Sequence, residues 1–271
     1  MPVQAEAGTK VWQRRDRKKQ LLIWAGWFAG VFLFVYCWQI ISGNTMWFFV
    51  WDSPRIAADI ASRMVPPRWE YIYRIWDPLW DTINIATLGT VLALCMAVPV
   101  AFLAARNTTP DAYIVRPVAL FIIVSSRSIN SLIWALLLVS IIGPGVFAGT
   151  IAIALRSIGF CAKLLYEAIE EIDHSQVEAI EATGASRWQV MGYGIVPQIM
   201  PAFAGISVFR WDINIRESTV LGLVGAGGIG VELKASQDIL AWPQVTVILI
   251  AILATVLVSE WVSAKVRHAI I

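Results

Sequence analysis

The sequence has few charged residues, few cysteines and only two histidines, and these shortages exclude several classes of protein. Charged residues make up 15% of the 271 residues, whereas hydrophobic residues make up 58% and the mean hydropathy is +0.67. A soluble core of this composition would leave large apolar patches exposed, and a disordered chain would need more polar residues. The formal charge of +2 gives no sign of nucleic-acid binding. The composition therefore predicts a membrane protein, and the 14 tryptophans agree, since indoles are enriched at lipid–water interfaces.

Motifs for catalysis, metal binding and ATP binding are also missing. Cys37, Cys95 and Cys161 each lie in an apolar run without a Cys-x-x-Cys or a nearby histidine, which argues against disulfides and metal sites. The chain has no G-x-x-x-x-G-K-[ST], no H-E-x-x-H and no G-x-S-x-G, and His174 and His268 are not at ligand spacing. We therefore expect a chain that is not an enzyme and holds no cofactor of its own, with energy supplied by a partner.

Six apolar runs are long enough to cross a bilayer, which takes about 20 residues per helix. They are Leu21–Ile41, Ile83–Ala105, Pro117–Ile142, Val146–Leu165, the weaker run Ile199–Val224, and Val245–Val262. The first run follows a basic segment over residues 1–20 and is too long for a cleavable signal, so we interpret it as an uncleaved anchor. The expected fold class is an all-α membrane protein with six transmembrane helices.

Lysine and arginine near the ends of the spans indicate which side is cytoplasmic. With the amino terminus inside, the basic segments Arg106–Arg116 and Lys163–Arg187 and the carboxyl-terminal tail also fall inside, so both termini are predicted to be cytoplasmic. The loop over residues 42–80 falls outside, in the periplasm. Its apolar spacing predicts a short amphipathic helix on the outer surface, marked by Ile56, Ile60 and Met64 with Trp69 and Tyr73.

The longest inner stretch, residues 167–197, contains a helix–glycine–helix pattern. Gly184 suits a helix stop, and Ser186 is a good N-cap for a second helix, which should run to Pro197. Two short helices at an angle would form a rigid knob in the cytosol, and a soluble partner could push on it.

The spacing Glu178-Ala179-x4-Gly184-Ala185-x11-Pro197 resembles the EAA loop of ABC importer permeases. In that family the loop is a coupling helix that sits in a groove of the cytosolic ATPase subunit. Ile180 stands where the family usually has its second alanine. The residues to which the resemblance assigns ATPase coupling are Glu178, Ala179, Ala182, Gly184, Ala185, Arg187 and Pro197.

The stretches Ser131–Lys163, Glu167–Glu170 and Phe209–Gly230 resemble the phosphonate-type importer permeases, although Asn130 stands where many relatives have proline. The resemblance covers most of the chain from Asp81 onward. It implies a type I permease core over residues 81–271 with an extra amino-terminal helix, forming a homodimeric channel in the bacterial inner membrane. The implied partners are a second copy of the chain, a cytosolic ABC ATPase homodimer that binds ATP and Mg, and a periplasmic or lipid-anchored phosphonate- or phosphite-binding protein.

A glycine-rich stretch formally matches the dinucleotide-binding pattern G-x-G-x-x-G. That pattern has meaning between a strand and a helix of a soluble βαβ unit, whereas this stretch lies between two membrane runs. Glycines let helix backbones approach closely, so we interpret these residues as a helix-packing or gate element: Gly225, Gly227, Gly228 and Gly230.

Ionisable residues inside the runs are the candidate substrate pathway. They are Arg127, Arg156, Arg210, Asp212, Arg216 and Glu217. Charges at this depth face the bundle interior or water. One interpretation is structural ion pairing, of Arg210 with Asp212 or Glu217. The other is an anion pathway, because three spans supply arginine and only one supplies acids.

The predicted function is the permease subunit of an ABC importer for a phosphonate or a related phosphorus oxyanion such as phosphite. One alternative is a permease of the same fold for phosphate, methionine or a cation. A stand-alone secondary transporter is another, but it would need no cytosolic knob and should show an inverted repeat.

Overall fold

The computed structural model describes residues 3–6, 9–12 and 17–270 and divides the chain into two units, residues 1–59 and 60–271, which we describe separately. The first unit holds an antiparallel hairpin of β1 (Val3–Glu6) and β2 (Thr9–Trp12), then α1 (Arg17–Asn44). It also holds the start of α2 (Trp47–Met64). Apart from that hairpin, the described residues are helical or connect helices, in agreement with the all-α expectation.

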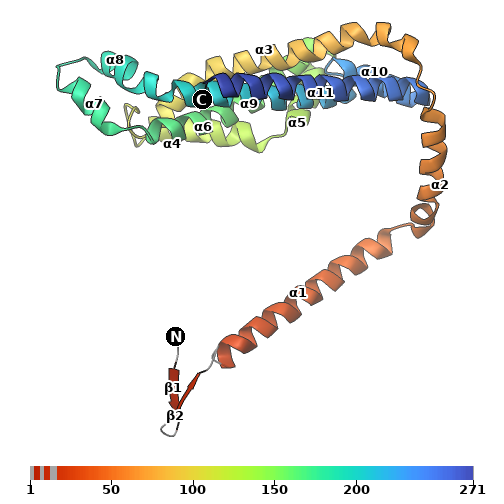
Figure 1. Cartoon of the computed structure of the whole chain (residues 1–271), viewed down its shortest axis with the longest axis horizontal. Coiled ribbons are helices and arrows are strands. Elements are labelled where there is room, and N and C mark those ends of the chain that lie inside the picture. The colour runs from red at the N-terminus through yellow and green to blue at the C-terminus, as the bar shows by residue number, and fades with distance from the viewer. Residues whose placement is uncertain (1–2, 7–8, 13–16, 271) are drawn as a thin grey trace. The chain divides into compact units, whose positions relative to one another are not determined.

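The second unit is a helical bundle (Figure 1). Its elements, in chain order, are η1 (Trp69–Tyr71), α3 (Ile72–Ala104), α4 (Val115–Ser128), α5 (Ser131–Ile142), α6 (Val146–Glu170), α7 (His174–Glu181), α8 (Arg187–Val190), the π-helix η2 (Met191–Ile195), α9 (Val196–Leu221), η3 (Gly222–Val224), α10 (Ile229–Asp238) and α11 (Trp242–Ile270).

Five of the predicted spans are continuous helical segments and the sixth is broken. Among the described residues, five segments are long and apolar enough to cross a membrane, and α4 with α5 makes a sixth only if this pair, bent by 87°, counts as one span. The prediction of one helix over Pro117–Ile142 is therefore wrong. Asn130 begins α5 as its N-cap, since its side-chain oxygen accepts a hydrogen bond from the backbone N–H of Leu132 at 3.1 Å.

The second span is longer than expected, because α3 begins at Ile72 rather than near Ile83. The segment predicted as the outer loop therefore ends earlier, and Tyr73 belongs to α3. Within that segment α2 covers Trp47–Met64, and Trp69 lies in η1. The side of the membrane on which α2 lies stays a prediction.

The centre of the bundle is formed by small residues where α3 and α6 cross. Ala97 and Ala101 of α3 and Ala162 of α6 are almost fully buried, and a Cβ on Gly89 would lie 2.8 Å from the Cγ2 of Ile153. Small side chains let the two backbones approach closely, as membrane helices require when no hydrophobic effect drives their association.

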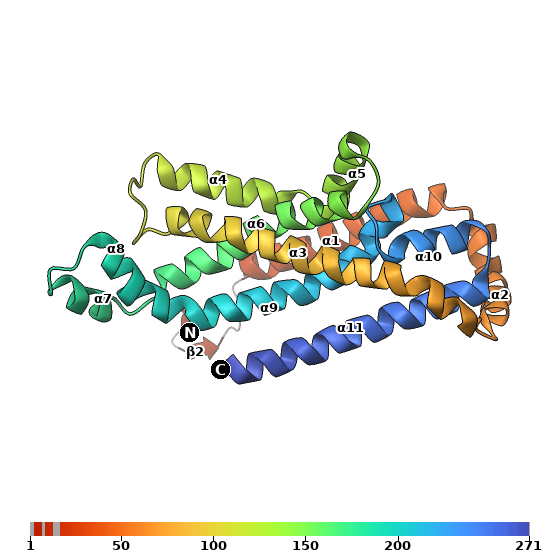
Figure 2. The same cartoon turned by 90° about the horizontal axis from the view of Figure 1, so that it is seen from above.

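Different elements lie at the two ends of the bundle (Figure 2). At one end lie α7 and α8, with the carboxyl ends of α3, α6 and α11; at the other lie α10 and the turns that join α5 to α6 and α9 to α10. The segments Arg106–Arg116 and Lys163–Arg187 and the tail therefore share one end. This grouping is the one that the predicted topology requires.

Candidate functional site

Three arginines and two carboxylates of α6 and α9 form a charge cluster inside the bundle. Its members are Arg156 on α6 with Arg210, Asp212, Arg216 and Glu217 on α9. Glu217 pairs with Arg156 and lies 3.5 Å from Nη2 of Arg210, whereas Asp212 pairs with Arg216 one turn along the same helix. Each carboxylate therefore has an arginine partner, and the cluster keeps one uncompensated positive charge.

Arg210 and Asp212 are the buried members of the cluster, and Arg210 is the buried arginine, at 2% exposure. Its Nε donates to Oγ of Ser157 at 2.9 Å, and its guanidinium carbon lies 5.1 Å from the ring centre of Phe160. Ser157 in turn donates to Asn214 at 3.2 Å, and Asn214 donates to Thr90 of α3 at 2.8 Å. This polar network joins α3, α6 and α9, so Arg210 is held by contacts from within the bundle.

A cavity of about 350 Å³ opens beside the cluster where α5, α6 and α9 meet. Asn130 and Ser131 line it from the start of α5, Arg156 lines it from α6, and Arg216 and Glu217 line it from α9. The side chain of Arg216 is 50% exposed and that of Arg156 is 31% exposed. Arg210 and Asp212 do not line this cavity, so the structure separates the six pathway candidates into groups.

Arg127 belongs to neither group. It lies in the last turn of α4, exposed, instead of halfway along a continuous span. Its Cγ would lie 2.9 Å from a Cβ on Gly159 of α6, so its aliphatic stem covers that glycine. It does not line the cavity.

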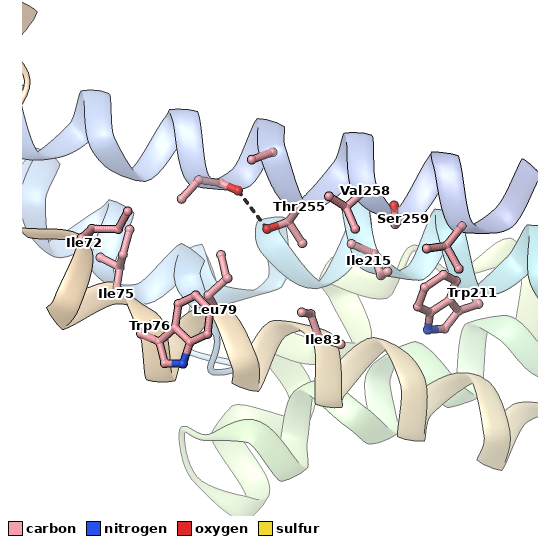
Figure 3. A pocket seen from close by; sticks show the side chains of 13 residues that line it. Ile72, Ile75, Trp76, Leu79, Ile83, Trp211, Ile215, Thr255, Val258 and Ser259 are labelled. Atoms are coloured by element: carbon pink, nitrogen blue, oxygen red, sulfur yellow. Dashed lines mark hydrogen bonds between the residues drawn. The ribbon is translucent and has the colours of Figure 1, made fainter. Parts of the chain in front are cut away.

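An apolar groove of about 450 Å³ lies on another side of α9, between α3 and α11 (Figure 3). Ile75 and Leu79 line it from α3, Ile215 lines it from α9 and Val258 lines it from α11. Ser259, also in its wall, donates to Oδ1 of Asp212 at 2.9 Å and so fixes the carboxylate that pairs with Arg216. The walls of this groove are almost entirely apolar, so the groove suits a lipid chain or another helix and does not suit an anion.

The glycine stretch forms a tight turn between η3 and α10. Gly225, Gly227 and Gly228 have φ of +84°, +83° and +77°, a backbone conformation that suits glycine. A Cβ on Gly230 would overlap the carbonyl oxygen of Thr219. The backbone N–H of Ile229 donates to Oγ1 of Thr82 on α3 at 2.8 Å, so the turn packs on the bundle.

The turn of the helix–glycine–helix knob has the predicted local structure: α7 ends at Glu181, Gly184 has φ of +82°, and α8 begins at Arg187. The prediction that the second helix ends at Pro197 is wrong, because α8 continues through η2 into α9 as one segment over Arg187–Val224. Ser186 begins α8, and its backbone N–H donates to Oε1 of Gln189 at 2.8 Å. At the other end, the Ser175 backbone and hydroxyl donate to Asp173, which lowers the pKa of that carboxyl. Pro197 lies in the first turn of α9.

The coupling candidates lie in and around this knob. Glu178 and Ala179 are exposed on α7, Ala182 and Gly184 are exposed in the turn, and Arg187 is exposed on α8. The structure therefore brings most of these motif residues to one protruding surface.

Comparison with known proteins settles the family. Residues 97–268 match the family model of the binding-protein-dependent transport system inner membrane component. The chain belongs to this family. As an inner-membrane transport component, it is a multi-pass membrane protein, and the family implies a separate ATPase and a substrate-binding protein as partners.

Two similar relatives come from Stutzerimonas stutzeri. The phosphite transport system permease protein PtxC is 40% identical over 211 residues, which are 78% of this chain and 76% of PtxC. The putative phosphite transport system permease protein HtxC is 34% identical over 76% of this chain and 77% of its own length. Among solved structures, an inward-facing MetNI methionine ABC transporter matches with a TM-score of 0.65 at 18% identity, over 74% of this chain and 98% of that chain. This last likeness shows the fold alone, a type I importer permease.

Several residues of this transport component were missed by sequence reasoning. Ser157, Asn214 and Thr90 form the network behind Arg210, and Ser259 holds Asp212. A signal existed for Asn214: it lies four residues after Arg210, and residues four apart share one face of an α-helix. For Thr90 and Ser259 the contacts are between helices, so spacing along the chain gives no signal.

Proposed function

We propose that this transport component carries a phosphonate, or a related phosphorus oxyanion such as phosphite, into the cytoplasm. The observation that carries the proposal is the cavity that Arg156 and Arg216 line together with Asn130 and Ser131, where Nη1 of Arg156 donates to Oγ of Ser131 at 3.5 Å. Guanidinium groups form bidentate hydrogen bonds that match phosphoryl oxygens, and they stay protonated when partly buried. The uncompensated positive charge of the cluster favours an anion over a cation or a zwitterion.

The carboxylates of the cluster would keep the cavity from trapping its substrate. In the empty state Glu217 and Asp212 neutralise Arg156 and Arg216. An entering anion has to compete with these carboxylates, so its net binding is weak enough for release. The half-exposed Arg216 is the more accessible of the two arginines for which the anion competes, and the relatives named for phosphite transport favour a phosphorus oxyanion as the ligand.

The knob is our proposed coupling surface for the partner ATPase. Its two short helices are braced by caps and by a turn with positive φ, so a push on the knob can move α9, which carries the charge cluster. The proposed assembly has two copies of this chain, two ATPase subunits that supply ATP and Mg, and a phosphonate- or phosphite-binding protein outside. The chain itself performs no catalysis in this scheme.

The proposed orientation has the knob and both termini in the cytoplasm. The segments Arg106–Arg116 and Lys163–Arg187 lie at the knob end of the bundle, and the uncharged Gly143–Gly145 turn lies at the opposite end. Positive charge on the cytoplasmic side is the rule for multi-pass membrane proteins. The binding protein would then dock at the end that carries α10.

Reconstitution in liposomes tests the proposal. The permease, its cognate ATPase and its binding protein are incorporated together, and uptake of phosphite, methylphosphonate, phosphate and D-methionine is measured with and without ATP. We expect ATP-dependent uptake of phosphite or methylphosphonate. ATP-dependent uptake of D-methionine with neither phosphorus compound transported would overturn the substrate assignment.

A further inference from the structure

Trp188 is an exposed indole on an otherwise anchored helix. Trp188 is 81% exposed, whereas Val190, two positions further along α8, is buried. A large apolar side chain in water on a rigid element is unfavourable unless a partner covers it, because burial of an aromatic side chain is a main source of interface stability.

The length of the helical rod argues against the bilayer as that partner. Residues Arg187–Val224 form a candidate span of 38 residues, which is about 57 Å long at 1.5 Å per residue. The hydrocarbon core is about 30 Å thick, so a rod that reaches the far edge at Val224 leaves the core near Gly205. Trp188 then lies about 25 Å further along the rod, beyond a headgroup layer of about 5–7 Å.

The tilt of the rod does not change this result. A tilt of 40°, the upper end of the observed range, places about 26 residues in the core and still leaves Trp188 more than about 10 Å outside it. The charge cluster stays near the middle of the bilayer in both cases. Trp188 therefore lies on the knob in the aqueous phase.

The knob holds the indole on a fixed mount. Gln189 Oε1 accepts hydrogen bonds from the backbone N–H and the hydroxyl of Ser186, at 2.8 and 2.9 Å. Below α8, Ile180 and Val177 of α7 cover Gly194 of η2, with 3.4 Å between Cδ1 of Ile180 and a Cβ placed on Gly194. A preorganised helix loses little conformational entropy on docking, which increases the affinity that its side chains can provide.

We infer that Trp188 anchors the knob on the partner ATPase by filling an apolar pocket of that subunit. This inference rests on the proposed function, since it assigns the ATPase to the knob. The motif residues of the coupling surface are small or polar, and Glu178, Ala179 and Gly184 supply little area for burial. Interface energy concentrates in buried tryptophan, tyrosine and arginine. The exposed Arg187 and Tyr193 can add to it, and Trp188 is the large aromatic side chain that α8 itself presents.

Affinity measurements on the permease in nanodiscs test the inference. Trp188→Ala should weaken binding of the cognate ATPase on the order of 30-fold, the equivalent of a hot-spot residue. The matched control is Tyr113→Ala, which removes another exposed aromatic outside the knob, from the α3–α4 connection, and should bind within about twofold of the wild type. Equal melting temperatures of the three proteins establish that each is folded.

The outcomes separate this inference from the proposed function. If the wild type binds the ATPase and Trp188→Ala binds equally well, the anchor assignment is wrong while the coupling proposal stands. If the wild type does not bind the ATPase at all, the proposed coupling function is wrong, and the inference that rests on it is wrong as well.

A spin label distinguishes the ATPase from lipid as the partner. The label is attached at Trp188→Cys in a chain whose Cys37, Cys95 and Cys161 are replaced by serine. We expect a label that is accessible to a water-soluble relaxation agent in lipid alone and protected after ATPase is added. A label that is already accessible to oxygen and shielded from water in lipid alone assigns the indole to the bilayer and overturns the inference, as does one that stays water-accessible with ATPase bound.

Discussion

Glu217 lies 3.5 Å from the guanidinium of Arg210, almost two turns away on the same helix. Residues seven apart in an α-helix lie on nearly the same face, at 3.6 residues per turn. The same carboxylate also pairs with Arg156 of α6. Glu217 therefore neutralises two arginines from two helices, one of them buried.

Glu217→Gln should destabilise the folded protein. The substitution leaves the buried Arg210 without a charged partner, and the loss of one member of a buried pair costs about 3–5 kcal/mol. Thermal unfolding in detergent should show a clear drop in melting temperature. The matched control is Asp238→Asn, which breaks the exposed pair with Lys234 and should change stability by less than about 1 kcal/mol. Equal melting temperatures for the two variants would contradict the role of Glu217.

Part of the ion pairing was predictable from spacing along α9. Arg210, Asn214 and Glu217 share one helical face, and Asp212 with Arg216 lies on another, since each residue advances about 100°. The pairing of Arg210 with Asp212, left open by the sequence, is excluded by this geometry, and the structure has Arg210 with Glu217. The burial of Arg210 was not predictable, because it depends on Ser157 and Phe160 of a different helix.

The break between α4 and α5 left only a weak signal in the sequence, namely Asn130, a residue suited to begin a helix. Residues 128–130 contain neither proline nor glycine, and the run Pro117–Ile142 is apolar on both sides. The bend follows from the cap that Asn130 provides for α5 and from the close packing of α4 on Gly159 of α6, where a Cβ would lie 2.8 Å from Oγ of Ser126. The knob was predictable in outline because Gly184 and Ser186 act locally. The contact between Ile180 and Gly194 gave no signal in the sequence, because it depends on the π-helix to which Gly194 belongs.

Gly184→Val should uncouple ATP hydrolysis from transport. Gly184 has φ of +82°, and a Cβ there would meet open space, so the strain is in the backbone alone. A β-branched residue is disfavoured in this conformation by roughly 1–3 kcal/mol, which should displace α7 relative to α8. Substrate-stimulated ATP hydrolysis in liposomes should be lost while membrane insertion is retained. Gly184→Asn is the matched control, because asparagine tolerates positive φ, and it should keep most of the coupling; full coupling in Gly184→Val would refute the argument.

Gly230→Ala should lower the yield of folded protein. A Cβ at this position would overlap the backbone carbonyl oxygen of Thr219, and a backbone atom cannot rotate away as a side chain can. Overpacking of this kind typically costs about 1–3 kcal/mol, which size-exclusion profiles and melting temperatures would report. Gly205→Ala in α9 is the control: its Cβ meets nothing within 4 Å, and alanine favours helix, so stability should be unchanged or higher.

Cysteine labelling should establish the orientation. Single cysteines are placed at Ser53 in α2 and at Ser186 in the knob, both exposed, in a chain that lacks the three native cysteines. An impermeant thiol reagent added to spheroplasts should label Ser53→Cys and should reach Ser186→Cys only after lysis. The reverse pattern would place the knob in the periplasm and remove the ATPase-coupling proposal.

Arg216→Gln should abolish uptake and should also lower the melting temperature, because the buried Asp212 loses its charged partner. Arg216 is half-exposed in the cavity, and its one carboxylate partner, Asp212, keeps a hydrogen bond from Ser259 when the arginine is removed. Loss of the guanidinium removes a bidentate ligand for the phosphoryl oxygens and takes the cluster from one net positive charge to none.

Lysine at position 216 separates charge from geometry. Arg216→Lys keeps the charge and loses the planar fork of donors, so we expect it to recover only part of the uptake rate, whereas Lys234→Gln, an exposed position on α10, should transport normally. Phosphite or methylphosphonate uptake in liposomes measures all three variants, and their ATPase binding reports assembly. If Arg216→Gln assembles normally and transports at the wild-type rate, Arg216 and Asp212 are a structural ion pair, and the anion passes elsewhere.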